Sequence, residues 1–210
     1  MIKNLYTEMH QKLTWILLFF SIYANAQSIK SIQLRPLQEN NYSAIVPLGT
    51  VLELSFDDLE ADSKDYQYKI EHMTSDWKSS RLLSSQYIDG FDQNTIINVN
   101  NSFNTLQNYT HYSVKIPNIN TKITKSGNYL LSILDEYDEI VFTRRFVLYE
   151  RTTTIGVSVI RSRITKTVNQ QQTVQFSVNH PRLQINNPSQ EIKVVILENN
   201  NWNEIITGLQ

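Results

Sequence analysis

The chain has 210 residues, of which 40% are hydrophobic, 10% aromatic and 19% charged, so it can bury a core in one domain or two small ones. The formal net charge is -1, which leaves no excess of positive charge for binding nucleic acid or an anionic membrane surface. The absence of cysteine excludes disulfides, thiolate metal sites, a cysteine nucleophile and the lipid-attachment cysteine of a bacterial lipoprotein.

The first 26 residues are typical of a secretory signal peptide. Lys3 and Lys12 give a basic start, residues 13–23 form one apolar run, and Ala24-Asn25-Ala26 follows as a small-x-small cleavage site. The run is shorter than the roughly 20 apolar residues that a membrane-spanning helix needs. We therefore predict cleavage after Ala26 and an exported, periplasmic chain, with an uncleaved membrane anchor as the alternative.

Alternation of apolar and polar residues with period two predicts strands along the next part of the chain. Leu52, Leu54 and Phe56 alternate with polar residues, for example, whereas residues 129–134 are apolar on both faces apart from Ser132 and predict a central strand. The predicted strands are 29–34, 52–56, 66–70, 112–116, 129–134 and 140–149. The predicted core comprises Leu52, Leu54, Phe56, Tyr68, Ile70, Val114, Tyr129, Leu131 and Ile133.

A local motif refines the fold class. Residues 127–131 (GNYLL) resemble the G-x-Y-x-C opening of strand F in immunoglobulin domains, with Leu131 at the cysteine position. In that fold the tyrosine hydroxyl is hydrogen-bonded to an upstream backbone group. The immunoglobulin tryptophan lies on strand C, whereas Trp77 follows the strand at 66–70. We therefore predict an immunoglobulin-like antiparallel β-sandwich over residues 27–150, without assigning its topology.

The strand pattern restarts after residue 150 and predicts a second β domain over residues 151–210. Apolar alternation or apolar runs occur at 155–159, 174–178 and 192–197. Three or four such strands have one apolar face and little to cover it. Either this sheet packs on the first domain or the chain is a fragment, and we favour an incomplete second domain.

The sequence contains no catalytic motif, so we expect a protein that binds a partner and is not an enzyme. His72, His111 and His180 are far apart, and no H-E-x-x-H, G-x-S-x-G or Walker glycine loop occurs. These patterns give no reason to expect a cofactor or a metal.

Two charged features leave alternatives open. The stretch from Asp57 to Asp65 carries five carboxylates but departs from the EF-hand template, so it is either an irregular calcium site or, as we favour, a solvated turn. Arg144 shares a strand face with Phe142 and Phe146. Either a bulge turns it outward, which we favour, or its guanidinium is buried against a carboxylate.

Several phrases in a fixed order resemble one family. They are IQLRPL (32–37), LELSFDDL (52–59), YQYKIEH (66–72), YIDGF (87–91), SFNTL running into YTHY (102–112) and FTRRF (142–146). Together they resemble the plug proteins of the Bacteroidetes type 9 secretion system, from residue 29 to the end. The resemblance implies a periplasmic, outer-membrane-associated protein that docks on the outer-membrane translocon barrel and closes its periplasmic opening. Family members are longer than this chain, in line with an incomplete second domain.

Two other classes share some of these features. The segments 66–71 (YQYKIE), 76–77 (DW) and 127–129 (GNY) resemble the Y-Y-Y sandwich domains of periplasmic sensor kinases, which transmit signals between larger domains. A carbohydrate-binding module is a further alternative, and it would need an exposed platform of aromatic rings.

For contact with a partner we expect loops at one end of the first sandwich. The connection 73–91 is long and carries Trp77, Tyr87 and Phe91 among polar residues, which is the composition of an interface hot spot. The alternative is that these rings fold back over the edge of the sandwich, because long loops often bury their own side chains.

Overall fold

The computed structural model describes residues 28–37, 42–166, 168–181, 183–197, 199, 201–202 and 205–207, the last three as backbone only. The predicted leader and its cleavage site lie outside these residues. Among the residues described, no helix is long and apolar enough to cross a membrane.

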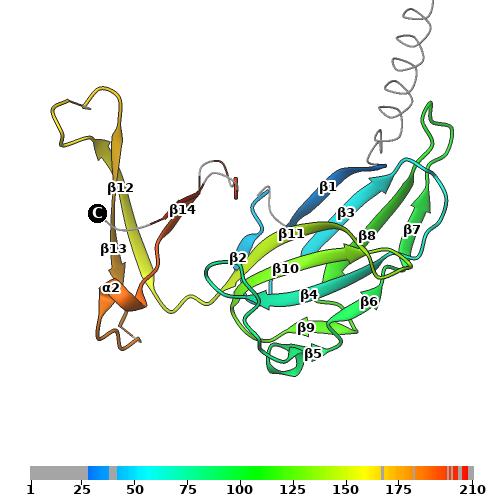
Figure 1. Ribbon diagram of the computed structural model, residues 1–210, viewed down its shortest axis with the longest axis horizontal. Coiled ribbons are helices and arrows are strands. Elements are labelled where there is room, and N and C mark those ends of the chain that lie inside the picture. The colour runs from blue at the N-terminus through cyan, green and yellow to red at the C-terminus, as the bar shows by residue number, and fades with distance from the viewer. Residues whose placement is uncertain are drawn as a thin grey trace, which may run out of the picture.

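Two sheets pack face to face in the first part of the chain (Figure 1). One has the order β1 (Ile29–Pro36), β3 (Leu52–Asp58), β8 (Thr110–Ile116) and β7 (Asn98–Asn101). The other has the order β2 (Ile45–Pro47), β11 (Ile140–Tyr149), β10 (Gly127–Leu134), β4 (Gln67–Met73) and β6 (Gln93–Thr95). A small pair, β5 (Ile88–Gly90) and β9 (Thr121–Ile123), lies beside them, and the 3-10 turn η1 (Ser84–Gln86) precedes β5.

This topology matches that of immunoglobulin domains and confirms the predicted all-β sandwich. The first sheet has the order of immunoglobulin strands A-B-E-D, and β11, β10, β4 and β6 have the order G-F-C-C′. The pairing of β2 with β11 is parallel, while the other strand pairs are antiparallel. Strand β10 lies at the centre of its sheet, as its apolar faces predict.

The core lies between the two sheets and contains the residues predicted from the alternation. Eight of the nine are buried; Val114 is half-buried and packs against the cluster. Stacked aromatic rings link neighbouring strands within each sheet. The ring centroids of Phe56 and Tyr112 are 5.1 Å apart, and those of Tyr129 and Phe146 are 5.2 Å apart. Aromatic pairs of this kind add to the free energy gained by burial.

The residues at the start of β10 confirm the strand F motif. The Tyr129 hydroxyl donates a hydrogen bond to the Lys125 carbonyl at 2.6 Å, and Leu131 has no solvent exposure. Gly127 has φ +150°, and a Cβ at this position would lie 2.5 Å from His72 Nε2. Glycine is therefore required both by the backbone conformation and by the neighbouring ring.

Neither alternative for Arg144 describes what the structure shows. The register shift between β10 and β11 leaves Val141 as the extra residue, so the bulge lies three positions before Arg144. Arg144 pairs with Leu131 and is half-buried; its guanidinium carbon lies 5.5 Å from the centre of the Phe142 ring, and Nη1 donates to the Thr143 carbonyl at 2.9 Å. No carboxylate within the described ranges forms an ion pair with it.

The rest of the chain forms smaller sheets. Strands β12 (Thr154–Arg161) and β13 (Gln172–Asn179) form an antiparallel hairpin, followed by the short helix α2 (Pro188–Glu191) and the pair β14 (Val195–Leu197) and β15 (Ile205–Thr207). One face of the hairpin is apolar, yet Ile155, Val157 and Val159 are 57–63% exposed. We call residues 154–207 the second β unit and propose that it begins a separate domain.

Candidate functional site

The connection between β4 and β6 places the three predicted contact residues in three different environments. Trp77 lies in a tight turn directly after β4, Tyr87 follows η1, and Phe91 follows β5. Of the three, Phe91 alone is largely exposed.

Tyr87 belongs to the core. It is 4% exposed, and its ring centroid lies 5.6 Å from that of His72 and 6.0 Å from that of Tyr129. Its hydroxyl is 3.4 Å from the Ile70 carbonyl, to which it donates. For Tyr87 the structure supports the alternative in which the ring folds back, so an aromatic platform that includes it does not form.

Trp77 is held by contacts within the chain. The guanidinium carbon of Arg145 lies 4.8 Å from the centre of the Trp77 ring. The Trp202 ring lies 4.8 Å from it between centroids, and the two ring planes are inclined at 79°. The ring is half-buried although the preceding residues Thr74, Ser75 and Asp76 are exposed.

The Phe91 side chain is 67% exposed, while hydrogen bonds hold its backbone in place. Its amide donates to the Asn120 carbonyl at 2.8 Å, and its carbonyl accepts from Thr121 Oγ1 at 2.7 Å. Asn120 also lines a groove of about 260 Å³ whose wall includes Ile97 and Ile119, which are 90% and 99% exposed. We call Phe91, Ile97 and Ile119 the Phe91 patch.

Neither isoleucine of this patch was predicted from the sequence as a contact residue. A signal was present, because each is a large apolar residue in a stretch rich in asparagine. The pairing of β5 with β9 brings the loop that holds Ile119 next to the backbone of Phe91, and Ile97 lines the same groove as Ile119.

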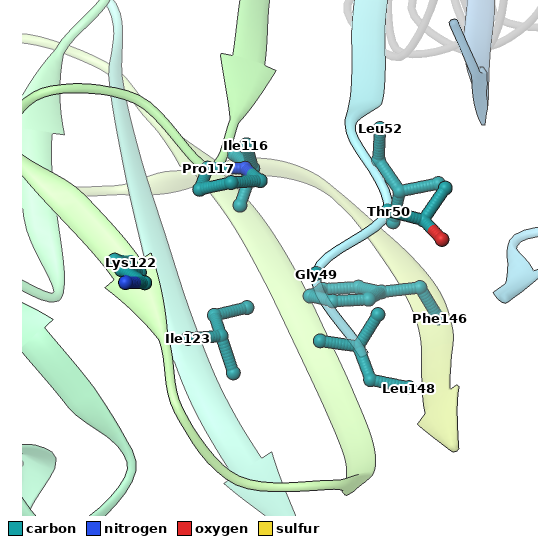
Figure 2. A pocket seen from close by; sticks show the side chains of 9 residues that line it. All are labelled: Gly49, Thr50, Leu52, Ile116, Pro117, Lys122, Ile123, Phe146 and Leu148. Carbon is teal, nitrogen blue, oxygen red and sulfur yellow. The ribbon is translucent and has the colours of Figure 1, made fainter. Parts of the chain in front are cut away.

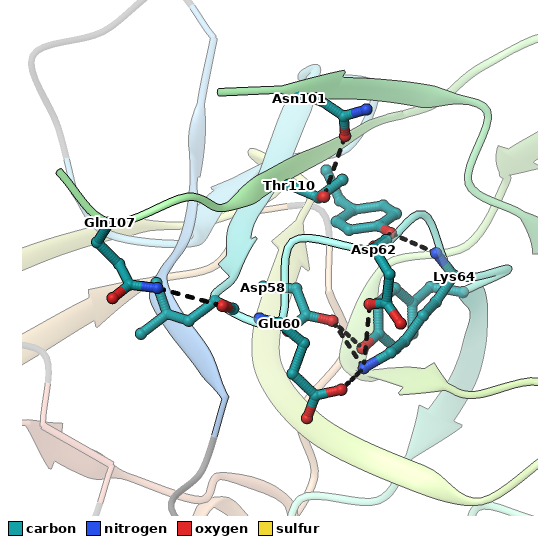
Figure 3. Close-up of polar contacts among 10 residues, drawn as sticks. Asp58, Glu60, Asp62, Lys64, Asn101, Gln107 and Thr110 are labelled. Carbon is teal, nitrogen blue, oxygen red and sulfur yellow. Dashed lines mark hydrogen bonds and ion pairs between the residues drawn. The ribbon is translucent and has the colours of Figure 1, made fainter. Parts of the chain in front are cut away.

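The acidic stretch exposes Glu60, Asp62 and Asp65 in a turn, in line with the solvated turn that we favoured. Asp58 departs from that expectation, because it is buried and joins an ionic cluster (Figure 3). Asp58 ends β3 with no solvent exposure and accepts hydrogen bonds from the Glu60 amide at 3.0 Å and the Tyr66 hydroxyl at 2.9 Å. Lys64 Nζ contacts Glu60 and lies 3.1 Å from Asp58 Oδ2 and 3.7 Å from Asp62 Oδ1.

These contacts shift the pKa of both partners. Burial alone would raise the pKa of Asp58, but the hydrogen bonds from Glu60 and Tyr66 and the charge of Lys64 outweigh it, so the pKa lies below its ordinary value. Burial alone would lower the pKa of Lys64, yet its bonds to Glu60 and Asp58 raise it. Carboxylate oxygens of Asp58, Glu60 and Asp62 lie within 4.8 Å of one another, so a cation entering there would have to displace the ammonium group.

An apolar cavity of about 110 Å³ lies at one end of the sandwich core (Figure 2). Its lining residues are Gly49, Thr50, Leu52, Ile116, Pro117, Lys122, Ile123, Phe146 and Leu148. It offers few polar groups to orient a ligand, in contrast to typical small-molecule sites, so it does not define a binding site.

The histidines do not converge. His72 packs against Tyr87 and Tyr129, while His111 Nδ1 lies 2.6 Å from Asp57 Oδ1 on the first sheet. In the part of the chain that the structure describes, the acidic cluster is the one group of potential metal ligands, and it includes no histidine.

Comparison with known proteins identifies the family. The sequence model of the type 9 secretion system plug protein 1st domain matches residues 29–150, which is more than half of the 210 residues. The chain belongs to the type 9 secretion system plug protein family. Membership supports involvement in type 9 secretion and a periplasmic, envelope-associated location, and it gives no indication of enzymatic activity. No curated protein matches the chain.

A solved structure shares the fold of this plug family chain. A hypothetical protein from Parabacteroides merdae, 30% identical, superposes with a TM-score of 0.81 over 89% of this chain. The match covers 48% of that protein, so the chain spans about half its length. A Pseudomonas fluorescens alkylpurine DNA glycosylase bound to DNA gives 16% identity and a TM-score of 0.33, over 64% of this chain and 33% of the glycosylase.

Proposed function

We propose that the protein docks on the outer-membrane translocon barrel of the type 9 secretion system and closes its periplasmic opening. The match of residues 29–150 to the plug family carries this proposal. Closure by a folded body is steric, so it needs a firm core and a contact surface but no catalytic group. The outer-membrane association and cleavage after Ala26 belong to the same proposal.

The Phe91 patch is the contact surface that we propose. Its three side chains are large, apolar and 67–99% exposed, and amide side chains such as Asn94 and Asn120 surround them. An apolar centre with a polar rim is the usual anatomy of a protein interface. A plug must also be released, which favours an interface of standard size, on the order of 1,600 Å² in total.

Affinity purification of the tagged protein from envelope extract tests the function. We expect the wild type to recover an outer-membrane barrel of the secretion system, identified by mass spectrometry. A wild-type protein that recovers no such barrel would show that the plug function is wrong.

Substitutions then test the patch. Phe91→Ala and Ile119→Ala are each expected to lower the recovered barrel at least about fivefold, since truncation of a hot-spot residue costs more than 1 kcal/mol. Phe103→Ala is the matched control, because Phe103 is 92% exposed on the β7–β8 connection outside the patch. Recovery at wild-type yield by both patch variants, with unchanged melting temperatures, would exclude the patch and leave the function standing.

A further inference from the structure

The turn after β4 is fixed by its own hydrogen bonds. The Thr74 amide donates to the Lys78 carbonyl at 2.8 Å, and the Trp77 amide donates to the Thr74 carbonyl at 3.0 Å. Trp77 has φ +57°, a left-handed conformation that is uncommon for a bulky residue. The hydrogen bonds fix the backbone of the turn, and this conformation needs contacts around it to persist.

Those contacts come from both parts of the chain. Arg145, from β11 of the sandwich, covers the Trp77 ring, and Trp202, from the second β unit, meets the same ring edge-on. Lys193 of the second β unit also donates from Nζ to Ser75 Oγ at 3.0 Å and lies 3.5 Å from Asp76 Oδ1. Two residues of the second β unit thus contact one turn of the sandwich.

We propose that the turn Thr74–Lys78 is a docking surface for the chain's own second β unit. In this interaction, which we call the latch, Trp77 contacts both Arg145 and Trp202, and Lys193 binds the adjacent Ser75 and Asp76. The inference is independent of the proposed function, because the latch shares no residue with the Phe91 patch. It also assigns Trp77 to an internal contact and not to an outside partner.

The latch is weak enough to open. An aromatic pair or a cation–π contact shifts an equilibrium by about 2- to 10-fold. The Lys193–Asp76 pair contributes less, because both side chains are more than 60% exposed. The covalent connection between the units is short, running over residues 150–153, which keeps the effective concentration of the second unit high. Together these effects favour the closed arrangement, in which the second β unit is docked on the turn, over the open one, in which it is released. The closed arrangement is therefore favoured but not permanent.

Distance measurement between two spin labels tests the latch. The chain has no cysteine, so Lys115→Cys on the sandwich and Gln175→Cys on β13, both exposed, give two specific labelling sites. Double electron–electron resonance is expected to give a narrow distance distribution in the labelled protein that carries no substitution in the latch. Trp77→Ala and Trp202→Ala are each expected to broaden it, with the ratio of closed to open molecules falling about fivefold or more.

Controls separate the latch from misfolding. Trp202 lies outside the sandwich, so its substitution leaves the fold of the sandwich intact even if Trp77→Ala lowers the melting temperature. Phe103 is an exposed aromatic residue that is remote in sequence from the turn. The Phe103→Ala variant is therefore expected to keep the narrow distribution. A broad distribution in the labelled protein without further substitution, or a narrow one in the Trp202→Ala variant, would overturn the proposal.

Discussion

Asp58 illustrates how the sandwich tolerates a buried charge at the end of a core strand. The carboxylate has no solvent exposure, and burial of an unpaired carboxylate would cost several kcal/mol. Two hydrogen-bond donors and the ammonium group of Lys64 offset that cost. The sequence showed the carboxylates but not this arrangement, because alternation predicts which face a residue takes and not which charges meet at the end of a strand.

Removal of Lys64 is therefore expected to destabilise the sandwich. Lys64→Met should lower the free energy of unfolding by about 1–3 kcal/mol, below the range for a fully buried pair because Lys64 is 30% exposed. Lys69→Met is the matched control, since the Lys69–Glu71 pair is exposed at 3.8 Å and should contribute less than about 0.5 kcal/mol. Urea unfolding measures both; equal effects of the two substitutions would contradict the role given to Lys64.

His72 is expected to make stability depend on pH. Burial among aromatic rings and the nearby Lys125 lower its pKa below the ordinary value of 6.5, although a hydrogen bond with the Ser126 backbone raises it. The unfolded chain then binds a proton at a higher pH than the folded chain does. The stability from the neutral ring is complete above about pH 6.5 and is lost as the pH falls, by at most about 1.4 kcal/mol per pH unit.

Unfolding free energies at pH 7.5 and 5.5 check this expectation. The wild type should be less stable at pH 5.5, and His72→Gln should reduce the difference between the two values. An unchanged difference in the His72→Gln protein would assign the pH dependence to other groups.

At the scale of the strands, period-two alternation predicted the elements that form the core. Strands β3, β8 and β10 follow the predicted segments closely because one face of each packs against the opposite sheet. The short edge strands β2, β6 and β7 were not predicted. Strands β6 and β7 have little apolar character, and β2 has only three residues. Backbone pairing places all three in the sheets, and for β2 and β6 the partner strand is distant in sequence.

Local sequence patterns likewise predicted only part of the candidate site. The long connection after β4 could be recognised from its length and its aromatic residues. Which rings turn inward depends on contacts with β10 for Tyr87 and with the second β unit for Trp77, and no local pattern encodes such contacts. Ile119 likewise becomes part of a surface only through the pairing of β5 with β9.

Leu131 tests the register of the central strand. It has no solvent exposure and lies between Ile70 on β4 and Arg144 on β11. Leu131→Ala should lower the free energy of unfolding by about 2–5 kcal/mol, the usual cost of truncating a buried leucine. A change below about 0.5 kcal/mol would show that the side chain points outward, because a shift of one residue reverses the faces of a strand.

At the scale of the whole molecule, the two parts of the chain differ in how much apolar surface they cover. The sandwich encloses a continuous core between two sheets, whereas the β12–β13 hairpin leaves Ile155, Val157 and Val159 more than half exposed. An isolated two-stranded hairpin is marginally stable at best in water. The stability of the second β unit must therefore come largely from contacts beyond its own strands, of which the latch is one.

This difference predicts the behaviour of the separated parts. Residues 27–150 expressed alone should unfold in one cooperative thermal transition, because the core of the sandwich lies entirely within them. Residues 151–210 expressed alone should show no such transition, since conformational entropy outweighs the small buried area. Circular dichroism during heating, with ¹H–¹⁵N spectra of each piece, measures both outcomes. A cooperative transition and dispersed amide signals from 151–210 would show that the hairpin face is covered by the unit's own residues, and that the second unit does not depend on contact with the sandwich.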